Sequence, residues 1–473
     1  MTGAGTARGG LPHGSRVVLT RDVKALDGGR VLAGGSPLTA VQLSDAAAQV
    51  LRGWAVPVQD DTSAAVADRL LALDLADPRF DDGPATTATA RDLTVVVPVR
   101  DRTTPLDRCL SALAPLRVVV VDDGSHDPAA VAAVVHRHGA GLIALPENHG
   151  PAAARNAGLR QVRTPLVAFV DSDVRAPAEV LRRLGREFAD PALDLVGPRV
   201  VPAPRAGRVR WFHRYDEIAS SLDMGPAAGR VRPGARLSYL PSACLVARTA
   251  SLAPGFAPEL RVGEDVDLVW RLAAAGGVVR YVPRYVVRHD SRDTFREWFA
   301  TKFSYGSGGA DLGRRHGPLI APAVLTGPTA AVAVAVLLRR RWGVPVVLGA
   351  IALTAVRSAR RLPRSEGRHR LALTLSAGAA LGGVHQASSL LLRAWWPVVW
   401  PLALVSRTVR RAVTTAVVVD VVSARHAHPR EPLLRTLLGR RLDDLAYGAG
   451  LWVGALRERQ LSCLAVVRPR RRG

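Results

Sequence analysis

The chain contains 473 residues, of which 48% are apolar and 22% are charged, and its formal net charge is +24. This composition excludes general disorder and supplies enough apolar residues for two or three folded domains. Residues 313–473 contain 26 arginines and six acidic residues, so +20 of the net charge lies in the last third of the chain. Apolar runs separate these arginines and no nucleic-acid motif with interleaved aromatic residues is found, which favours a membrane over nucleic acid as the partner.

The spacing of the cysteines and the first residues of the chain indicate the cellular compartment of the protein. Cys109, Cys244 and Cys463 have neither metal-site nor disulfide spacing, which is typical of a reducing environment. The first twenty residues lack the apolar core of a signal peptide, so we expect the N-terminus to stay in the cytoplasm.

Residues 1–90 are expected to form a small α+β module followed by a linker. Two short strands are predicted at 15–20 and 30–33 around the Asp27-Gly28-Gly29 turn, helices at 44–51 and 63–73, and a linker at 78–91. Two interpretations of the module remain open. It is either a winged-helix-like unit that recognises a peptide or a packing extension of the next domain.

Residues 91–312 show the strand–helix alternation of an α/β domain. Short β-branched runs lie at 93–99, 117–123, 141–146 and 166–170, and helical stretches separate them. This pattern predicts a mostly parallel sheet with helices on both faces. Three of the four strands end in polar residues, at the end of the sheet where open α/β folds bind ligands.

The sequence Asp171-Ser172-Asp173 follows the fourth of these strands. Two acidic residues at i and i+2 of an extended chain point the same way, and a cation between them would relieve their repulsion. Their oxygen atoms suit Mg²⁺ or Mn²⁺ bridging a diphosphate. The alternative is an ordinary turn, in which such pairs are common.

Further candidate nucleotide ligands follow the other strands. The first strand ends in Pro98-Val99-Arg100-Asp101, and the second ends at Asp123, before Gly124-Ser125. A carboxylate in such a place can accept from a nucleobase or a ribose hydroxyl, although Asp-Gly is also a common turn. Gly150 precedes a helix that begins with proline, and Arg155 in this helix could brace the carboxylates or reach the nucleotide.

These motifs, in this order and spacing, resemble those of the large inverting family of nucleotide-sugar glycosyltransferases with the GT-A fold. The resemblance continues downstream. Residues 241–246 are similar to the acceptor-side strand of the family, and residues 263–272, which include Glu264-Asp265, are similar to its Glu-Asp motif.

The resemblance implies a role for each candidate residue. Asp123 would contact the uracil of a UDP-sugar donor and Asp171 its ribose, whereas Asp173 would bind Mg²⁺ or Mn²⁺ together with the diphosphate. Asp265, beside Glu264, would be the general base for in-line attack by the acceptor hydroxyl. His289 would complete the metal shell. Glu264 and Asp265 could instead be acidic residues that stabilise a helix N-terminus. His289 could instead be a hydrogen-bonded histidine at the end of a strand.

One family signature is missing. The Gln-x-x-Arg-Trp motif of processive polysaccharide synthases is absent, and Arg292, Arg296, Trp298 and Lys302 stand in the corresponding place. Contacts from these cations to the diphosphate are possible, but the sequence does not support synthesis of long chains.

Residues 313–473 are expected to form a helical, membrane-associated region on the cytoplasmic side of the membrane. Residues 318–338 and 371–392 contain no Asp, Glu, Lys or Arg and are long enough to cross a bilayer. Residues 342–356 and 394–406 are shorter apolar runs, and residues 440–452 form an amphipathic segment. Arginines flank residues 318–338 on both sides, so in-plane or re-entrant helices are alternatives to crossing helices.

The whole architecture resembles the glycosyltransferases of mycofactocin biosynthesis. This resemblance implies metal-dependent transfer of glucose from UDP-glucose, in β linkage, onto a small peptide-derived redox cofactor. A polyprenyl phosphate or a cell-wall glycan is the alternative acceptor. An alternative from another functional class is a membrane-tethered scaffold that binds a peptide. A nucleotidyltransferase is a further alternative, but it would leave the Glu-Asp motif without a role.

Overall fold

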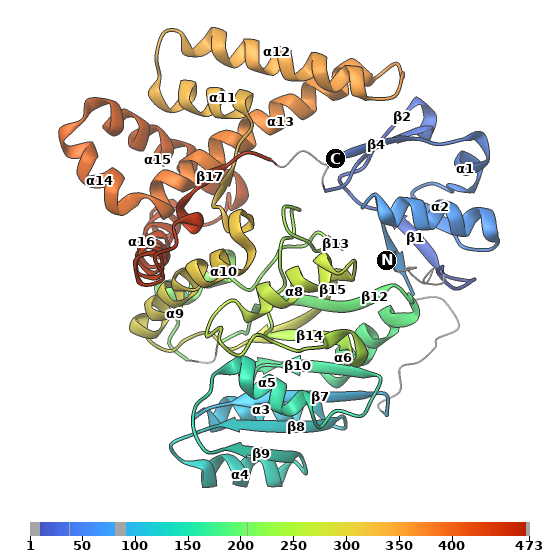
Figure 1. Ribbon diagram of the computed structural model, residues 1–473, viewed down its shortest axis with the longest axis vertical. Coiled ribbons are helices and arrows are strands. Elements are labelled where there is room, and N and C mark those ends of the chain that lie inside the picture. Colours follow the sequence, from blue (N-terminus) through green and yellow to red (C-terminus); the bar gives the residue numbers. More distant parts are fainter. Residues whose placement is uncertain (1–9, 37, 81–90, 206, 470–473) are drawn as a thin grey trace. The chain divides into compact units, whose positions relative to one another are not determined.

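The computed structural model describes residues 10–36, 38–80, 91–205 and 207–469 (Figure 1). These residues form two compact units. The first contains the described residues up to Gly207 together with Ala219–Ser291, and the second contains Arg208–Ile218 together with the described residues from Arg292 onward. The module expected at residues 1–90 thus shares a unit with the α/β domain, and the C-terminal unit begins before the expected boundary at 313.

The first unit is built on a sheet with the strand order β11-β15-β12-β14-β10-β7-β8-β9. The four predicted strands lie within one residue of their expected bounds: β7 (Leu93–Val99), β8 (Arg117–Asp123), β9 (Gly141–Leu145) and β10 (Leu166–Val170). These four strands pair in parallel, with β7 between β10 and β8. Their carboxyl ends therefore meet at one edge, as predicted.

The rest of the sheet is mixed. β14 (Cys244–Arg248) lies antiparallel between β10 and β12 (Leu193–Pro202), and β12 is parallel to β15 (Val278–His289). Two short strands, β11 (Val174–Arg175) and β13 (Gly229–Arg230), are antiparallel to β15. The sheet is thus parallel in the half that the sequence predicted, and antiparallel pairs occur only in the other half of the described sheet.

Helices cover both faces of the sheet. Alternate residues of β7, including Val95 and Val97, pack with α3 (Thr103–Leu113), α4 (Pro128–Arg137) and α6 (Ala178–Arg186). On the opposite face, Gly158 of α5 (Pro151–Leu159) lies against Val96 and Val121. A Cβ atom at Gly158 would be 2.3 Å from Val96 Cγ1, so glycine is what lets α5 approach the sheet this closely.

The N-terminal module is α+β, as predicted, but its pairing differs from the expected one. Its two sheets contain β1 (Arg16–Leu19), β5 (Ala55–Pro57) and β6 (Ala76–Arg79), and β2 (Lys24–Leu26), β3 (Val31–Gly34) and β4 (Thr39–Gln42). Across the Asp27–Gly29 turn β3 pairs with β2, and β1 pairs with β5 and β6 instead. A short turn joins only the strands directly beside it, and Lys-Ala-Leu is a weak strand signal.

The two helices of the module are found where they were predicted. Ser44 caps α1 (Asp45–Val50), and a capping box of Asp60 and Ser63 starts α2 (Asp61–Ala72) two residues before the expected position. The predicted linker begins later than expected, because Pro78 and Arg79 belong to β6, and most of it, residues 81–90, lies outside the described residues.

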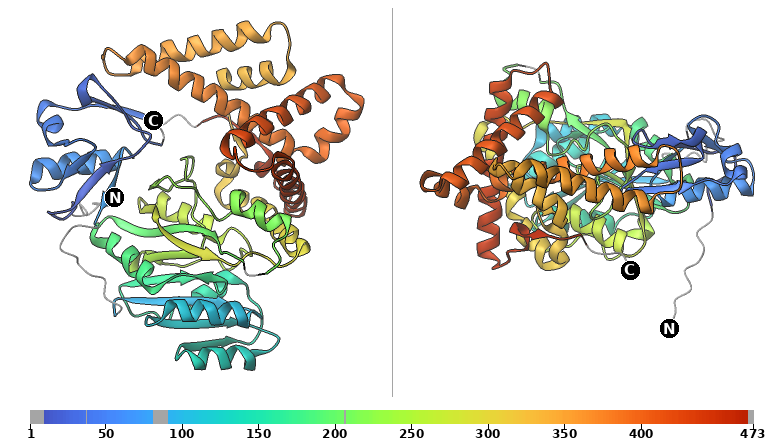
Figure 2. Two further views of the ribbon diagram at one scale, coloured as in Figure 1. Left: turned by 180° about the vertical axis from the view of Figure 1, so that it is seen from behind. Right: turned by 90° about the horizontal axis from the view of Figure 1, so that it is seen from above.

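The second unit is mostly helical. Its helices are α7 (Trp211–Ala219), α9 (Phe295–Ser307), α10 (Gly309–His316), α11 (Gly327–Leu338), α12 (Gly343–Arg361), α13 (Arg368–Ser389), α14 (Trp396–Val405), α15 (Arg407–Ala427) and α16 (Leu433–Arg457), with a two-stranded sheet of β16 (Ala323–Val324) and β17 (Val466–Val467) (Figure 2). The amphipathic segment expected at 440–452 lies within α16.

The apolar segments differ from the predicted membrane helices. Residues 318–338 are not one helix, because the Thr326 capping box and Pro328 start α11, which has only 12 residues. α12, expected to be too short, is 19 residues long with a mean hydropathy of 1.3, and it is the one described helix that is long and apolar enough to cross a membrane by itself. α13 and α14 would count as a second span only as one broken pair, which is bent by 92°.

An aromatic core explains why Arg208–Ile218 belongs to the second unit. Trp211 packs edge-on against Trp298, whose side chain is almost fully buried and whose Nε1 donates to Asp216 Oδ1 at 2.9 Å. Lys302 Nζ lies 3.5 Å from Asp216 and 3.7 Å from Asp443. Lys302, a candidate contact to the diphosphate, therefore forms ion pairs inside this helical unit, and Trp298 packs in its core.

Candidate active site

A buried arginine links two of the predicted site carboxylates. Arg155, from α5, donates from Nη2 to Asp171 Oδ1 at 2.6 Å and from Nη1 to Glu264 Oε1 at 2.7 Å. Its guanidinium also stands 5.4 Å from the centre of the Phe256 ring. Burial tends to lower the pKa of Arg155, but the two carboxylates raise it above its ordinary value, so this cation is permanent. Arg155 thus joins the end of β10 to the start of α8 (Glu264–Ala274).

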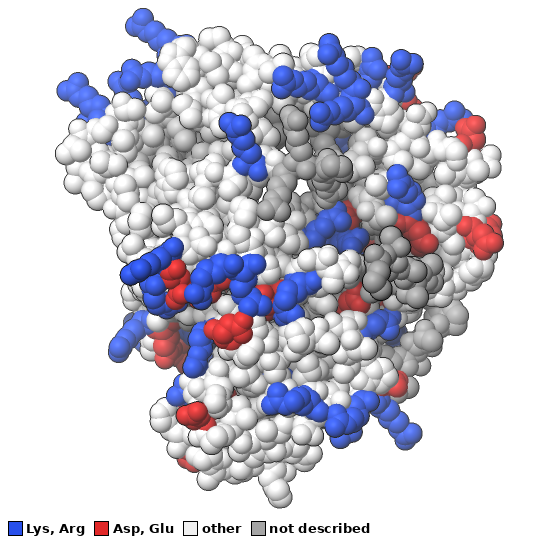
Figure 3. All heavy atoms as spheres, in the orientation of Figure 1, with Lys and Arg blue, Asp and Glu red and all other residues white. Residues whose placement is uncertain are grey.

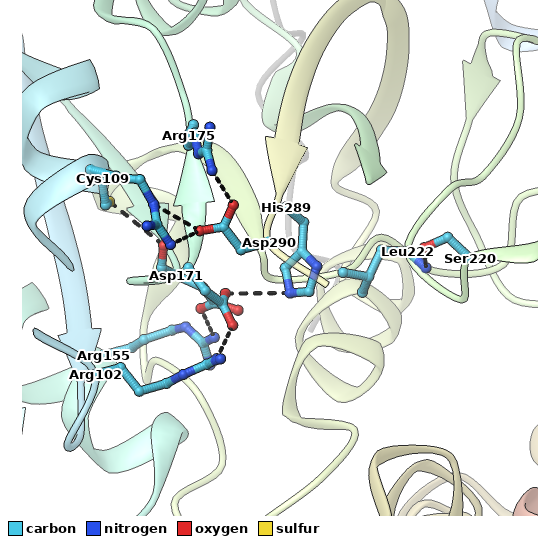
Figure 4. A network of polar contacts seen from close by, with 11 residues as sticks. Arg102, Cys109, Arg155, Asp171, Arg175, Ser220, Leu222, His289 and Asp290 are labelled. Carbon is cyan, nitrogen blue, oxygen red and sulfur yellow. Dashed lines mark hydrogen bonds and ion pairs between the residues drawn. The ribbon is translucent and has the colours of Figure 1, made fainter. Parts of the chain in front are cut away.

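The second aspartate of the Asp-Ser-Asp sequence faces a histidine and an arginine. Asp173 Oδ1 is 3.4 Å from His289 Nε2, and Asp173 Oδ2 accepts from Arg102 Nη1 at 2.5 Å (Figure 4). Pairing of β11 with β15 brings Val174 opposite His289, which explains the contact between residues so distant in sequence. The strand end and the histidine therefore meet, and the metal role of both side chains stays a prediction.

A second aspartate beside this pair is held by arginines. Asp290 accepts from Arg175 Nη2 at 2.7 Å and from Arg108 Nη2 at 2.6 Å, and its N–H donates to the carbonyl oxygen of Asp173. Figure 4 shows the side chains of Arg175 and Asp290 pointing toward one another. Asp290 therefore fixes the position of Asp173 through the backbone.

The residues that follow β7 and β8 order the neighbouring loops. Asp123 accepts from the N–H groups of His149 and Gly150 at 2.8 and 2.9 Å, one to each carboxylate oxygen. Gly150 has a φ of 93°, which favours glycine, and its backbone begins α5. Asp101 accepts from the N–H of His126 at 2.6 Å. These contacts join the strand ends and leave base and ribose recognition a prediction.

The remaining residues of the first motif contribute mainly backbone. The Val99 side chain is buried in the core, and Pro98 precedes it in β7. Arg100 is exposed, and its Nε lies 3.6 Å from Asp101 Oδ2.

The predicted base stands at the N-terminus of α8. Asp265 Oδ2 accepts from the N–H of Ser242 at 3.0 Å, and Oδ1 accepts from the N–H of Val266 at 2.8 Å. Gly263, with a φ of 85°, turns the chain into this helix. Burial and the adjacent Glu264 carboxylate raise the pKa of Asp265 to about 7, although both N–H donors act in the opposite direction. A half-buried carboxyl with this pKa is suited to exchange protons near neutral pH.

The donor set around Asp173 fits a divalent cation that also binds a substrate. In the described part of the chain, no group of three or more His, Cys, Asp or Glu side chains is arranged to hold a metal ion. Asp173 and His289 nevertheless bring a carboxylate oxygen and an imidazole nitrogen together. Mg²⁺ sites in phosphate-handling enzymes take one or two carboxylates and complete the shell with phosphate and water. The two side chains therefore suit a cation held jointly with a diphosphate.

Sequence reasoning missed three residues of this arrangement. Arg102 directly follows the first motif. Arg100 and Asp101 were selected because they lie at the end of a strand, and the same criterion could have included Arg102. Ser242 lies in the segment matched to the acceptor-side strand, but only its backbone N–H reaches Asp265. Asp290 follows His289 directly, and its role depends on arginines far away in sequence.

Comparison with known proteins agrees with this geometry. Residues 94–248 match Glycosyl transferase family 2. The chain is 38% identical over 466 residues to the pre-mycofactocin glycosyltransferase of Mycobacterium tuberculosis, which covers 96% of this chain and 98% of that protein. An N-acetylglucosaminyltransferase of Rhizobium sp. is 30% identical over 198 residues, 38% of this chain and 43% of that protein.

Solved structures are more distant. A mannosyltransferase of Pyrobaculum calidifontis, in complex with GDP-Man and Mn²⁺, aligns with a TM-score of 0.38 and 18% identity over 74% of this chain and 91% of that chain. The glucosyl-3-phosphoglycerate synthase of Mycobacterium tuberculosis aligns with a TM-score of 0.34 and 19% identity over 48% of this chain and 80% of that chain.

The predicted enzyme class, a glycosyltransferase of the GT-A fold, is confirmed by the nearly full-length match. The chain therefore belongs to the family of the pre-mycofactocin glycosyltransferases, and its residues 94–248 match Glycosyl transferase family 2.

Proposed function

We propose that this glycosyltransferase is metal-dependent and inverting, and that it transfers glucose from UDP-glucose in β linkage onto a small peptide-derived acceptor. The observation that carries the proposal is the Asp265 carboxyl, which has a pKa of about 7 and is held by two backbone N–H groups. A base with this pKa takes up the acceptor hydroxyl proton at neutral pH without leaving its position.

Each charged residue has a separate task in this proposal. Asp265 removes the proton from the acceptor hydroxyl as the oxygen attacks the anomeric carbon from the side opposite the leaving UDP. Arg155 fixes the start of α8 relative to the strand end that carries Asp171, because it binds both Glu264 and Asp171. Asp123 and Gly150 order the loop that would face the nucleotide base.

Asp173 and His289 are the side chains that would hold Mg²⁺ or Mn²⁺. When bound, the cation would neutralise the charge that develops on the departing diphosphate. The positive charges on Arg102, Arg108 and Arg175 would add to the attraction for a polyanionic donor.

The acceptor is proposed from the relative that matches nearly the whole chain. That protein is named a pre-mycofactocin glycosyltransferase, and 38% identity over 96% of this chain supports an acceptor of the same kind. The N-terminal module is proposed to recognise the peptide part of the acceptor.

Membrane association on the cytoplasmic side is part of the proposal. α12 exposes Val344, Leu348, Leu353 and Val356, and clusters of arginine lie before and after the helix. In Figure 3, arginine side chains flank an uncharged surface in the region of α11, α12 and α13. Apolar side chains between basic clusters favour an anionic lipid surface. This surface also favours the second candidate acceptor, a polyprenyl phosphate.

The proposal can be tested by incubating the purified full-length protein with UDP-glucose, Mn²⁺ and either pre-mycofactocin or a short polyprenyl phosphate. We expect hexose additions to pre-mycofactocin by mass spectrometry, loss of product with EDTA, and a β-anomeric coupling by NMR. UDP-galactose and UDP-N-acetylglucosamine serve as donor controls. If product formed only on the polyprenyl phosphate, that molecule would be the acceptor instead. An α linkage in the product would contradict the inverting mechanism.

A further inference from the structure

We propose that Arg102 occupies Asp173 as a substitute cation while the donor is absent, and so competes with the divalent metal for this carboxylate. The inference rests on the proposed metal role of Asp173 and adds a regulating residue to it. Arg102 is the N-cap residue of α3, just beyond the end of β7. It therefore lies on the ligand-binding edge of the sheet.

The contact places a positive charge where the metal would bind. Arg102 Nη1 is 2.5 Å from Asp173 Oδ2, while the other oxygen faces His289 Nε2. The Asp173 side chain is only 8% exposed. A buried carboxylate requires a cationic or hydrogen-bonding partner, and removal of that partner leaves the charge without compensation. Arg102 supplies such a partner in the absence of a metal.

Arg102 is freer than Arg155 to leave its carboxylate, and it is the arginine that pairs with Asp173 itself. Its side chain is 31% exposed, whereas that of Arg155 is 3% exposed and is tied to carboxylates from two elements. Arg108 and Arg175 pair with Asp290. An ion pair with a partly exposed arginine is weak enough for a divalent cation to displace.

The donor would shift this competition. A bound diphosphate brings negative charge to the same edge, which attracts the guanidinium away from Asp173 and adds oxygen ligands for the metal. Metal and nucleotide should therefore bind cooperatively, and each should strengthen binding of the other by the same factor. Arg102 would thereby keep Asp173 from taking a metal before the sugar donor arrives.

The test measures Mn²⁺ affinity by the electron paramagnetic resonance signal of free Mn²⁺, with and without UDP, on the full-length protein. The variants are Arg102→Met, which keeps an unbranched stem and loses the charge, and Arg102→Lys, which keeps the charge. Arg137→Met is the control, because it removes an exposed charge that pairs with Asp107 and takes no part in the proposed donor site. Asp173→Ala reports whether Mn²⁺ binds at this carboxylate.

We expect Arg102→Met to bind Mn²⁺ about 5- to 10-fold more tightly than wild type without UDP. Its cooperativity with UDP should fall by the same factor, and the cooperativity that remains comes from the diphosphate oxygens that bind the metal. Arg102→Lys should lie between wild type and Arg102→Met, and Arg137→Met should change the affinity by less than about 2-fold. A damaged site cannot give tighter binding, so this result would not arise from misfolding.

Two outcomes would overturn the inference, and they are distinguishable. If Asp173→Ala loses Mn²⁺ while Arg102→Met binds it no more tightly than wild type, the competition is wrong and the metal role remains. If Arg102→Met does not fold, Arg102→Gln takes its place, and Mn²⁺ affinity no tighter than that of wild type likewise excludes the competition. If wild type binds no Mn²⁺ at Asp173 even with UDP, both the metal role and the inference fall.

Discussion

Arg155 and Glu264 are joined by a buried hydrogen bond of 2.7 Å between Nη1 and Oε1, although 109 positions separate them in the chain. The same guanidinium binds Asp171. The helix that carries the predicted base is thus connected to the strand end that carries the predicted metal ligand. A single buried cation sets the geometry between them, so its removal should affect both stability and catalysis.

Arg155→Met should destabilise the protein strongly. The substitution leaves two carboxylates near a buried position without their cation, and the loss of one partner from a buried ion pair costs about 3–5 kcal/mol. Urea denaturation followed by tryptophan fluorescence measures the effect. Arg183→Met is the control, since Arg183 is exposed and pairs with Glu179 on the surface of α6. Equal stability of the two variants would show that the Arg155 network does not support the fold.

Asp265→Asn should separate chemistry from donor binding. Asparagine keeps the size of the side chain but cannot take up a proton, so glucosyl transfer should fall by about 10²- to 10⁴-fold. Affinity for UDP-glucose, measured by calorimetry, should change little. Asparagine caps helices about as well as aspartate. Transfer above about a tenth of the wild-type rate would therefore show that Asp265 only caps the helix. Glu264 or Asp267 would then be the candidate for the general base.

The pH profile should reflect the raised pKa of Asp265. The base acts when ionised, so kcat/KM should rise with pH through about 7 and level off above it. Stability has the opposite dependence. Between the ordinary aspartate pKa of about 4 and about 7, the folded protein holds the proton more tightly than the unfolded chain, so this residue contributes less to stability as pH rises.

Asp265→Asn removes that titration and provides the check on it. Relative to wild type, the variant should become more stable as the pH increases from about 5 to about 8, when midpoints of urea denaturation are compared. A constant stability difference across this range would place the raised pKa on another group.

Gly158→Ala should separate close packing from helix propensity. The new methyl carbon would lie 2.3 Å from Val96 Cγ1, and overpacking of this kind costs about 1–3 kcal/mol. Gly378→Ala in α13 is the matched control, because a Cβ there has no atom within 4 Å and alanine favours a helix by up to about 1 kcal/mol. Melting temperatures should move in opposite directions. A fall for both variants would contradict the explanation.

Leu348→Glu should weaken membrane association. Leu348 is 63% exposed on the apolar surface of α12, and a carboxylate there opposes burial among lipid chains and attraction to anionic head groups. We expect about a 10-fold loss of binding in sedimentation with phosphatidylglycerol vesicles. Leu142→Glu on the edge strand β9, where Leu142 is 38% exposed, is the control. Equal losses for the two variants would move the lipid-binding surface away from α12.

The sequence predicted those parts of the fold that depend on local patterns. Four β-branched runs correctly predicted strands β7 to β10. The strand–helix alternation predicted that the carboxyl ends of these strands lie at one edge of the sheet. The Asp-Ser-Asp sequence was found for the same reason, since it lies at the end of a strand. The Glu-Asp motif was identified by family resemblance. His289 was placed beside Asp173 by family resemblance alone.

Contacts between distant residues could not be predicted in this way. The antiparallel position of β14 depends on pairing with β10 and β12, which no local pattern specifies. Asp290 matters because β11 pairs with β15 and brings it near Asp173. Arg102 matters because it follows β7, which pairs with β10, the strand before Asp173. The length of the apolar helices depended on one capping box at Thr326, which divided a run that hydropathy alone had treated as continuous.

The placement of Arg208–Ile218 constrains how this gene could be shortened or recombined. The chain passes between the two units at residues 207–208, 218–219 and 291–292, so no single cut separates them. A truncation after Ser291 would leave Trp211, Phe212 and Tyr215 without Trp298, which is almost fully buried among them. A fragment that keeps only the first unit would need a replacement for residues 208–218, which contain most of α7, as well as a new C-terminus.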